Sequence, residues 1–201
     1  MNEILATLYI CFWDPSLPPE FGQYFESDLF FCFTRLMTDM RDGFLRSMDS
    51  EATGINGKVA EFDFLMMRID PQLHQHLSDE GLDPQYYSLR WLMLLLSQEF
   101  EISNVIRLWD TVLADHDKFT FVNFICVGMV VSQRDFLLRN EFSECLEHLQ
   151  TQSSDPNPQV IKNVLDVAKK CCLKVSRRYE HYIEQELHQG KESLFSATKN
   201  K

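Results

Sequence analysis

Apolar residues recur every three or four positions along nearly the whole of this 201-residue chain. This spacing places them on one face of an α-helix, whereas no segment shows the alternation typical of a β-strand. We therefore predict an all-α fold of about eight helices, packed together through aromatic side chains. Because 45% of the residues are hydrophobic, the chain has enough apolar surface to bury a core.

Proline, glycine and polar clusters separate the helical segments. Asp70-Pro71 and Asp83-Pro84 each predict a helix start, because the carboxylate accepts backbone N–H bonds and a proline in the first turn has no N–H to lose. An extended linker is expected over 14–19. The predicted helices cover residues 1–13, 26–47, 55–68, a short segment from Pro71, 84–100, 102–114, 118–138, 141–149 and 159–188, where the last ends near Gly190.

Three of these helices carry a stripe that we expect to face the core. The stripes consist of Ile4, Leu5, Leu8, Tyr9 and Phe12 in the first helix, Phe30, Phe33, Met37, Met40 and Phe44 in the second, and Val160, Val164, Val167, Cys171, Val175 and Tyr182 in the last. The helix over 84–100 is apolar on nearly all sides, which predicts a central, buried position.

The charge is acidic overall, with a net value of −11, and it is unevenly distributed. Residues 1–156 carry 25 acidic and 10 basic residues, whereas residues 157–201 carry five and nine. Nucleic-acid binding requires a basic surface, so we expect no nucleic-acid partner. The most apolar stretch, Phe119 to Val131, is shorter than the roughly 20 residues of a membrane span. With no signal peptide at the start, we expect a cytoplasmic protein without an integral membrane segment.

Common catalytic and cofactor motifs do not occur. The sequence has no phosphate-binding loop, dinucleotide fingerprint or nucleophile elbow, and none of its six cysteines forms a C-x-x-C pair. His74 and His76 lie about 200° apart on a helix, so they do not share a metal ion. Cys171 and Cys172 are adjacent on a predicted helix, so their side chains point in different directions. We expect no metal and no cofactor, although pairing between residues distant in sequence is left open.

Arg90 is the most informative single residue, because it lies in an otherwise apolar helix. A guanidinium group in such a place needs a carboxylate or backbone carbonyl groups as partners. Glu99 and Asp110 are the expected partners. The arginine either forms a structural ion pair that determines how two helices cross or, less in keeping with its apolar neighbours, belongs to a catalytic site, since arginines complete GTPase sites.

Several segments together resemble one known family. Residues 26–33 read E-S-D-L-F-F-C-F and residues 70–77 read D-P-Q-L-H-Q-H-L. Further along, R-W at 90–91, S-Q-E-F at 97–100 and I-R-L-W-D at 106–110 follow in order. These segments are similar to the "E-A-D-x-F-x-C-F", "D-P-x-L-x-x-H-L" and "R-W … x-x-E-F … x-R-L-W-D" segments of the TBC (Tre-2/Bub2/Cdc16) domain, a Rab GTPase-activating module. The resemblance runs from Met1 to about residue 150.

The resemblance implies an all-α domain that acts on GTP-bound Rab-family GTPases. Members of the family supply an arginine from "I-x-x-D-x-x-R" and a glutamine from "Y-x-Q-G"; such an arginine is worth about 10³–10⁵ in rate. Neither motif occurs here, so no catalytic residue is assigned. The family's glutamine motif continues as M-N-[DE], and the chain begins M-N-E. Asn2 and Glu3 are therefore the expected site-adjacent residues. The residues that carry the resemblance, expected to pack or form ion pairs, are Asp28, Phe30, Phe33, Asp70, Pro71, Arg90, Trp91, Glu99, Trp109 and Asp110.

The resemblance also predicts the organisation of the chain. Residues 1–150 are expected to form the C-terminal portion of a TBC domain, residues 151–158 a polar loop, and residues 159–201 an amphipathic helix with a frayed tail. The leading hypothesis is a Rab GTPase activator that is inactive as this chain alone and reaches endomembranes peripherally, through the GTPase. The alternatives are a non-catalytic helical module that binds a Rab or another protein and, with weak support, a metal or thiol enzyme.

Overall fold

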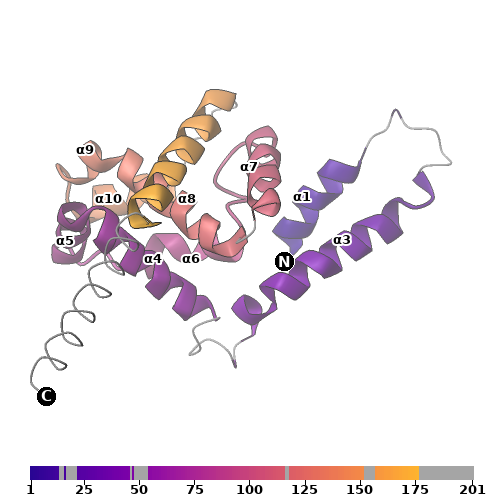
Figure 1. Ribbon diagram of the computed structural model, residues 1–201, viewed down its shortest axis with the longest axis horizontal. Helices are drawn as coiled ribbons and strands as arrows, with labels where there is room; N and C mark the ends of the chain where they lie inside the picture. Colours follow the sequence, from indigo (N-terminus) through magenta and orange to yellow (C-terminus); the bar gives the residue numbers. More distant parts are fainter. Residues whose placement is uncertain are drawn as a thin grey trace, which may run out of the picture.

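The computed structural model describes residues 1–13, 16, 22–45, 47, 54–115, 118–151 and 157–176. Within these ranges all regular structure is helical and no strand is present, which confirms the all-α prediction (Figure 1). The elements are α1 (Asn2–Phe12), α3 (Phe25–Met40), the 3₁₀-helix η1 (Arg41–Phe44), α4 (Ile55–Ile69), α5 (Pro71–Asp79), α6 (Gln85–Met93), α7 (Ile102–Ala114), α8 (Lys118–Ser132), α9 (Arg134–Leu137) and α10 (Phe142–Gln150), followed by a helix over 158–176.

Helix α8 forms the centre of the bundle. Every residue from 121 to 130 is buried, and α4, α6 and α7 pack against it. A helix that is apolar all round belongs in the middle of a core rather than at its edge. The sequence assigned this central position to the segment 84–100, whose first half is α6, but α8 is buried over more of its length.

The helix over 158–176 crosses α8 at a pair of small residues. A Cβ atom placed on Gly128 would lie 3.1 Å from the backbone nitrogen of Ala168, so any larger residue would require the Ala168 backbone to shift by a few tenths of an ångström. The buried residues of this helix are Ile161, Leu165, Ala168 and Cys171. The valines of the predicted stripe lie half-buried at the sides of this face, and Tyr182 and Gly190 lie outside the described residues.

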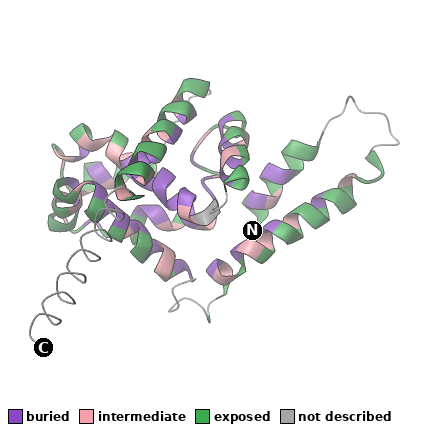
Figure 2. Ribbon diagram, in the orientation of Figure 1, coloured by how far each residue is buried: buried purple, intermediate pink, exposed green. Residues whose placement is uncertain are grey.

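Helices α1 and α3 form an antiparallel pair that extends away from the bundle, and α1 also contacts α7 (Figure 1). Ile4 and Leu8 of α1 are buried, as are Leu29 and Leu36 of α3. Figure 2 shows that the outer sides of both helices are largely exposed. The pair is therefore anchored along one side only. The expected linker over 14–19 lies outside the described residues apart from Ser16.

The predicted stripe of the second helix was partly wrong. Leu29, Leu36 and Met40 are its buried residues, whereas the side chain of Phe30 is 61% exposed. The segment from Leu29 to Phe33 is apolar or aromatic at every position but Cys32, so two stripes compete for the inner side. Packing against the neighbouring helix determines which stripe is buried, and the periodicity of a single helix does not predict it.

The predicted helix over 84–100 was also wrong in length, because α6 ends at Met93. Leu95 and Leu96 adopt φ angles of 50° and 61°, in the left-handed region that is costly for a residue with a Cβ atom. The N–H of Leu96 donates to Trp91 O at 2.9 Å, which closes the end of the helix. Both leucines are buried, so tertiary packing offsets the local strain. The predicted helix over 118–138 is likewise interrupted, because α8 ends at Ser132 and α9 covers Arg134–Leu137.

Candidate functional site

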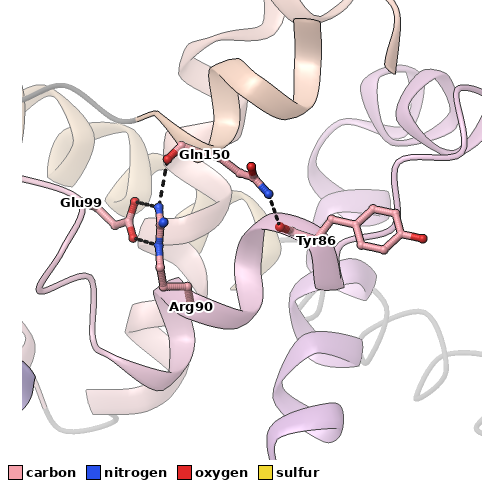
Figure 3. Close-up of polar contacts among 4 residues, drawn as sticks. All are labelled: Tyr86, Arg90, Glu99 and Gln150. Atoms are coloured by element: carbon pink, nitrogen blue, oxygen red, sulfur yellow. Dashed lines mark hydrogen bonds and ion pairs between the residues drawn. The ribbon is translucent and has the colours of Figure 1, made fainter. Parts of the chain in front are cut away.

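Arg90 and Glu99, two of the residues singled out in the sequence, form an ion pair (Figure 3). Arg90 Nε donates to Glu99 Oε1 at 2.7 Å and a terminal nitrogen donates to Oε2 at 2.9 Å. The same terminal nitrogen reaches Gln150 O at 3.0 Å, and Gln150 Nε2 donates to Tyr86 O at 2.9 Å. The network joins α6, the segment after it and the end of α10.

The buried partner is the carboxylate rather than the guanidinium. The Glu99 side chain is 1% exposed, whereas that of Arg90 is 44% exposed. In a continuous helix, residues nine apart are separated by about 13.5 Å along the axis, too far for this bidentate contact. The reversal at Leu95 and Leu96 is therefore what brings Glu99 back to Arg90. Glu99 is confirmed as a partner, and a structural ion pair is the arrangement seen.

Asp110, the other expected partner, does not contact Arg90. It is exposed on α7 and lies near the Cys11 thiol of α1, where burial and then the Asp110 carboxylate raise the pKa of that thiol. Its neighbour Trp109 is buried and donates Nε1–H to Leu95 O at 2.9 Å. Because adjacent residues on a helix face different directions, only one of the two turns toward the core.

Asp70 and Pro71 begin α5 as predicted. Asp70 Oδ1 accepts from the N–H of Leu73 at 3.1 Å, and Asp70 Oδ2 accepts from Arg134 Nε at 2.7 Å. The carboxylate therefore caps α5 and ties it to α9. Asp83 Oδ1 accepts from the N–H of Gln85 at 2.8 Å, but the N-cap of α6 is Pro84, so the predicted helix start was one residue too early.

The two histidines of this region have separate partners, as their spacing predicted. His74 Nε2 lies 2.8 Å from Asp63 Oδ1 on α4, whereas His76 Nε2 lies 2.9 Å from Leu137 O on α9. Within the part of the chain that the structure describes, no group of three or more His, Cys, Asp or Glu side chains is arranged to hold a metal ion. Cys171 is buried and Cys172 is half-buried, both as free thiols.

The remaining singled-out residues divide into a buried framework and an exposed set. Trp91 is fully buried and Phe33 is half-buried against the core, as expected for packing residues. The packing expectation is wrong for Phe30, which is largely exposed, and Asp28 is exposed beside it in the first half of α3. Asn2 and Glu3 are exposed in the first turn of α1.

Exposed apolar side chains gather on and next to α1 and α3, and we call this surface the α1–α3 face. Part of it is a cluster in which the Tyr9 ring stacks on Trp13 and both meet Phe25 edge-on. Phe30 and Phe31 lie against each other farther along α3. Exposed apolar groups of this kind mark interaction surfaces. The members of the face that are more than a third exposed are Tyr9, Ile10, Phe12, Trp13, Tyr24, Phe30 and Phe31.

Sequence reasoning missed this face because it assigned Tyr9, Phe12 and Phe30 to the core. A usable signal was present in the consecutive aromatics Phe30 and Phe31, since one helix side cannot bury both. None of the described helices is both long and apolar enough to cross a membrane.

Comparisons with known proteins bear directly on these segments. Residues 1–138 match the family described as Rab-GTPase-TBC domain. The chain is 39% identical over 151 residues to TBC1 domain family member 13 of Mus musculus, and to that of Homo sapiens, a match that covers 75% of this chain and 37% of each relative. It is 33% identical over 128 residues to the GTPase-activating protein gyp1 of Schizosaccharomyces pombe, which covers 63% of this chain and 24% of that protein.

A solved structure agrees with the family match. The crystal structure of the Ypt/Rab-GAP domain of Gyp1p superposes with a TM-score of 0.73 at 26% identity, over 83% of this chain and 56% of that one. The match with the member 13 relatives spans little more than a third of their length, since it covers 37% of each. The matched residues include α1, α3, the N-cap of α5, the Arg90–Glu99 pair and Trp109, and they show that the chain belongs to the TBC family of Rab GTPase-activating domains.

Proposed function

We propose that this protein binds GTP-loaded Rab-family GTPases and takes part in their inactivation. The family match over residues 1–138 carries the proposal. The α1–α3 face supports it, because an exposed aromatic surface is suited to contact a folded partner, and Asn2 and Glu3 are exposed at the start of the same helix α1. Membrane association would be peripheral and would follow from the location of the bound GTPase.

We also propose that this chain alone does not accelerate GTP hydrolysis. The family's arginine and glutamine motifs do not occur in these 201 residues. The charge that develops on the transferred phosphoryl group would then have no arginine supplied in trans. The only arginine of the apolar α6 segment, Arg90, is engaged by Glu99 and Gln150. We therefore expect the chain alone to bind a Rab without accelerating GTP hydrolysis.

Domain boundaries follow the same reasoning. Residues 1–150 would be the part of the chain that carries the TBC function, with Asn2 and Glu3 nearest the reacting nucleotide. Residues 151–158 would connect it to the helix over 158–176, which packs on α8 at Gly128.

The catalytic part is tested by single-turnover GTP hydrolysis on a panel of Rab proteins, with this chain in excess. Acceleration of less than about tenfold is expected, against the much larger factor that a supplied arginine gives. A larger acceleration of any Rab would show that the chain does supply catalytic groups and would overturn the limit stated above.

Binding is tested separately with GTP- and GDP-loaded forms of the same panel. We expect saturable binding of at least one GTP-loaded Rab and a weaker response of its GDP form. Phe31→Ala should weaken this binding, whereas the matched control Phe64→Ala, an exposed phenylalanine on α4, should not. Failure of every Rab to bind would contradict the proposal.

A second candidate function is a non-catalytic module that binds a protein other than a Rab. The α1–α3 face favours this candidate as much as it favours Rab binding, because an aromatic surface does not by itself specify its partner. The binding panel separates the two. Binding to no Rab, together with saturable and Phe31-dependent binding to an unrelated helical partner, would support the second candidate.

A further inference from the structure

Four exposed residues follow one another along the outer side of α3. Tyr24, Asp28, Phe31 and Arg35 are spaced by four, three and four positions, which places them on one line along the helix. Phe31 is 68% exposed and the Arg35 side chain is 74% exposed. The exposed thiol of Cys32 borders this line. We call these five residues the α3 stripe.

The two charges of the α3 stripe have opposite signs and lie on either side of Phe31. Asp28 and Arg35 are separated by about 10.5 Å along the helix axis, too far to pair with each other. Arg35 contacts Asp39 of its own helix at 3.6 Å, an exposed pair of a kind that contributes little to stability. A guanidinium group has five N–H donors, so Arg35 can serve a second carboxylate at the same time.

This arrangement of charges is complementary to itself when one helix is reversed. Asp28 and Arg35 are equally far from the point midway between Phe31 and Cys32. If two copies of α3 lie antiparallel, with a two-fold axis at that point, Asp28 of each copy faces Arg35 of the other. An interface with two-fold symmetry requires such a self-complementary patch. In a parallel alignment, each charge would instead face its own kind.

We propose that the α3 stripe binds a second copy of this chain in an antiparallel, two-fold symmetric contact. Phe31 supplies apolar surface at the centre, and the two pairs of Asp28 with Arg35 set the register of the helices. A partner with charge of only one sign is matched less well, because it would place a like charge against Asp28 or Arg35. A contact along one helix of 16 residues is expected to cover less than the standard area of about 800 Å² per partner, so the dimer should be weak and reversible.

Sedimentation equilibrium of the full chain tests the proposal. The average mass of the parent should rise with concentration from 23.7 kDa toward twice this value. Asp28→Arg and Arg35→Asp should each weaken self-association at least about tenfold, because each places like charges opposite one another at both ends of the contact. The double variant restores both pairs and should associate like the parent. A parent that stays monomeric, or single variants that associate as strongly as the parent, would overturn the proposal.

Mixing the two single variants tests the two-fold geometry. In a mixed dimer each arginine of the Asp28→Arg chain faces an aspartate of the Arg35→Asp chain. An equal mixture should therefore associate about as strongly as the parent, although neither variant does so alone. No recovery on mixing would mean that Asp28 and Arg35 do not face each other across the contact.

A non-specific charge effect makes the opposite prediction for one variant. The chain has a net charge of −11, so Asp28→Arg reduces the overall repulsion between copies and would then strengthen association. Asp135→Arg makes the same charge change on α9, where the residue is exposed, and should leave association unchanged. If it weakens association as much as Asp28→Arg does, the assignment to the α3 stripe is wrong.

The thiol of Cys32 reports the position of the two-fold axis. Packed helices lie about 8–10 Å apart, so the two Cys32 residues beside the axis should be linked by a short bismaleimide. Cys32→Ser should abolish the linked dimer, whereas Cys11→Ser, which removes the exposed cysteine of α1, should retain it. Dimers linked mainly through Cys11 would contradict the proposal. These experiments contain no GTPase, so their outcome is independent of the Rab proposal, although pairing would cover Phe31 and exclude Rab binding through it.

Discussion

Glu99 shows how one buried charge depends on a partner at the surface. Its carboxylate is almost fully buried, and Arg90 supplies both of the donors that satisfy it. Breaking a buried pair by removing one partner is costly because the remaining charge is left without compensation. Replacing both partners by apolar residues is often nearly neutral, because no unpaired buried charge is then left.

Arg90→Ala should therefore lower the free energy of unfolding by about 3 kcal/mol, measured by chemical denaturation. The control Arg107→Ala removes an exposed arginine on α7 and should change stability by less than about 0.5 kcal/mol. The double variant Arg90→Met with Glu99→Leu should recover much of the loss. An Arg90→Ala protein as stable as the parent would mean that Glu99 does not need its partner.

The cysteines differ in their environments, and their reactivity should differ accordingly. Cys11 and Cys32 are exposed, whereas Cys126 is fully buried and its burial raises the pKa of the thiol. Because the thiolate is the reactive form, iodoacetamide at neutral pH should modify Cys32 in the native protein and Cys126 only after unfolding. Peptide mass mapping before and after denaturation measures this, and modification of native Cys126 would contradict the described core.

At the level of elements, the crossing of α8 and the helix over 158–176 depends on one missing side chain. A Cβ atom on Gly128 would lie 3.1 Å from the backbone nitrogen of Ala168, and backbone moves aside less easily than the end of a side chain does. Glycine weakens an isolated helix by about 1 kcal/mol relative to alanine, so its presence in the middle of α8 reflects packing between helices.

Gly128→Val should destabilise the protein by about 2 kcal/mol, since overpacking a core typically costs 1–3 kcal/mol. Limited proteolysis should show earlier cleavage within 158–176, because this helix would pack less closely against α8. Ser132→Val puts the same side chain at the exposed C-terminal end of α8, where it removes only a hydrogen bond within that helix, and should leave the protease pattern unchanged. A Gly128→Val protein with parental stability would show that the two helices can separate at no cost.

At the level of the whole molecule, a packed bundle and a projecting helix pair coexist in one chain. The bundle buries residues 121–130 of α8 on all sides, whereas α1 and α3 bury one side and expose the aromatic α1–α3 face (Figure 2). Isolated apolar residues at a surface are normal, but contiguous ones favour association with a partner or another copy.

We expect the purified chain to self-associate through the α1–α3 face as concentration rises, as seen by light scattering coupled to size-exclusion chromatography. The double variant Phe30→Ser with Phe31→Ser should reduce this association and change unfolding free energy by less than about 0.5 kcal/mol, because both side chains are exposed. Phe64→Ser on α4 is the matched control and should associate like the parent. A parent protein that stays monodisperse at all concentrations would contradict this expectation.

Much of the local structure was predictable because it depends on residues close together in the chain. The 3.6-residue periodicity predicts the helices, and cap chemistry predicts the start of α5 at Asp70 and, to within one residue, the start of α6. A lone arginine in an apolar helix predicts a carboxylate partner, and Glu99 is that partner. The short segments around these residues also identify the TBC family, since their order and spacing are specific in combination.

Other features were decided only by contacts between distant residues. The end of α6 at Met93 depends on a reversal that Trp109 supports through Leu95 O, and the Arg90 network reaches Gln150 sixty residues away. The side of α3 that faces inward depends on its packing against α1. A hollow lined by Asp63, His74 and Tyr87 exists because α4, α5 and α6 meet there. The sequence by itself therefore determines the helices, their caps and the family, because these follow from local chemistry. Only the tertiary structure decides which faces are buried and which remain available to a partner, because burial is settled by what packs alongside.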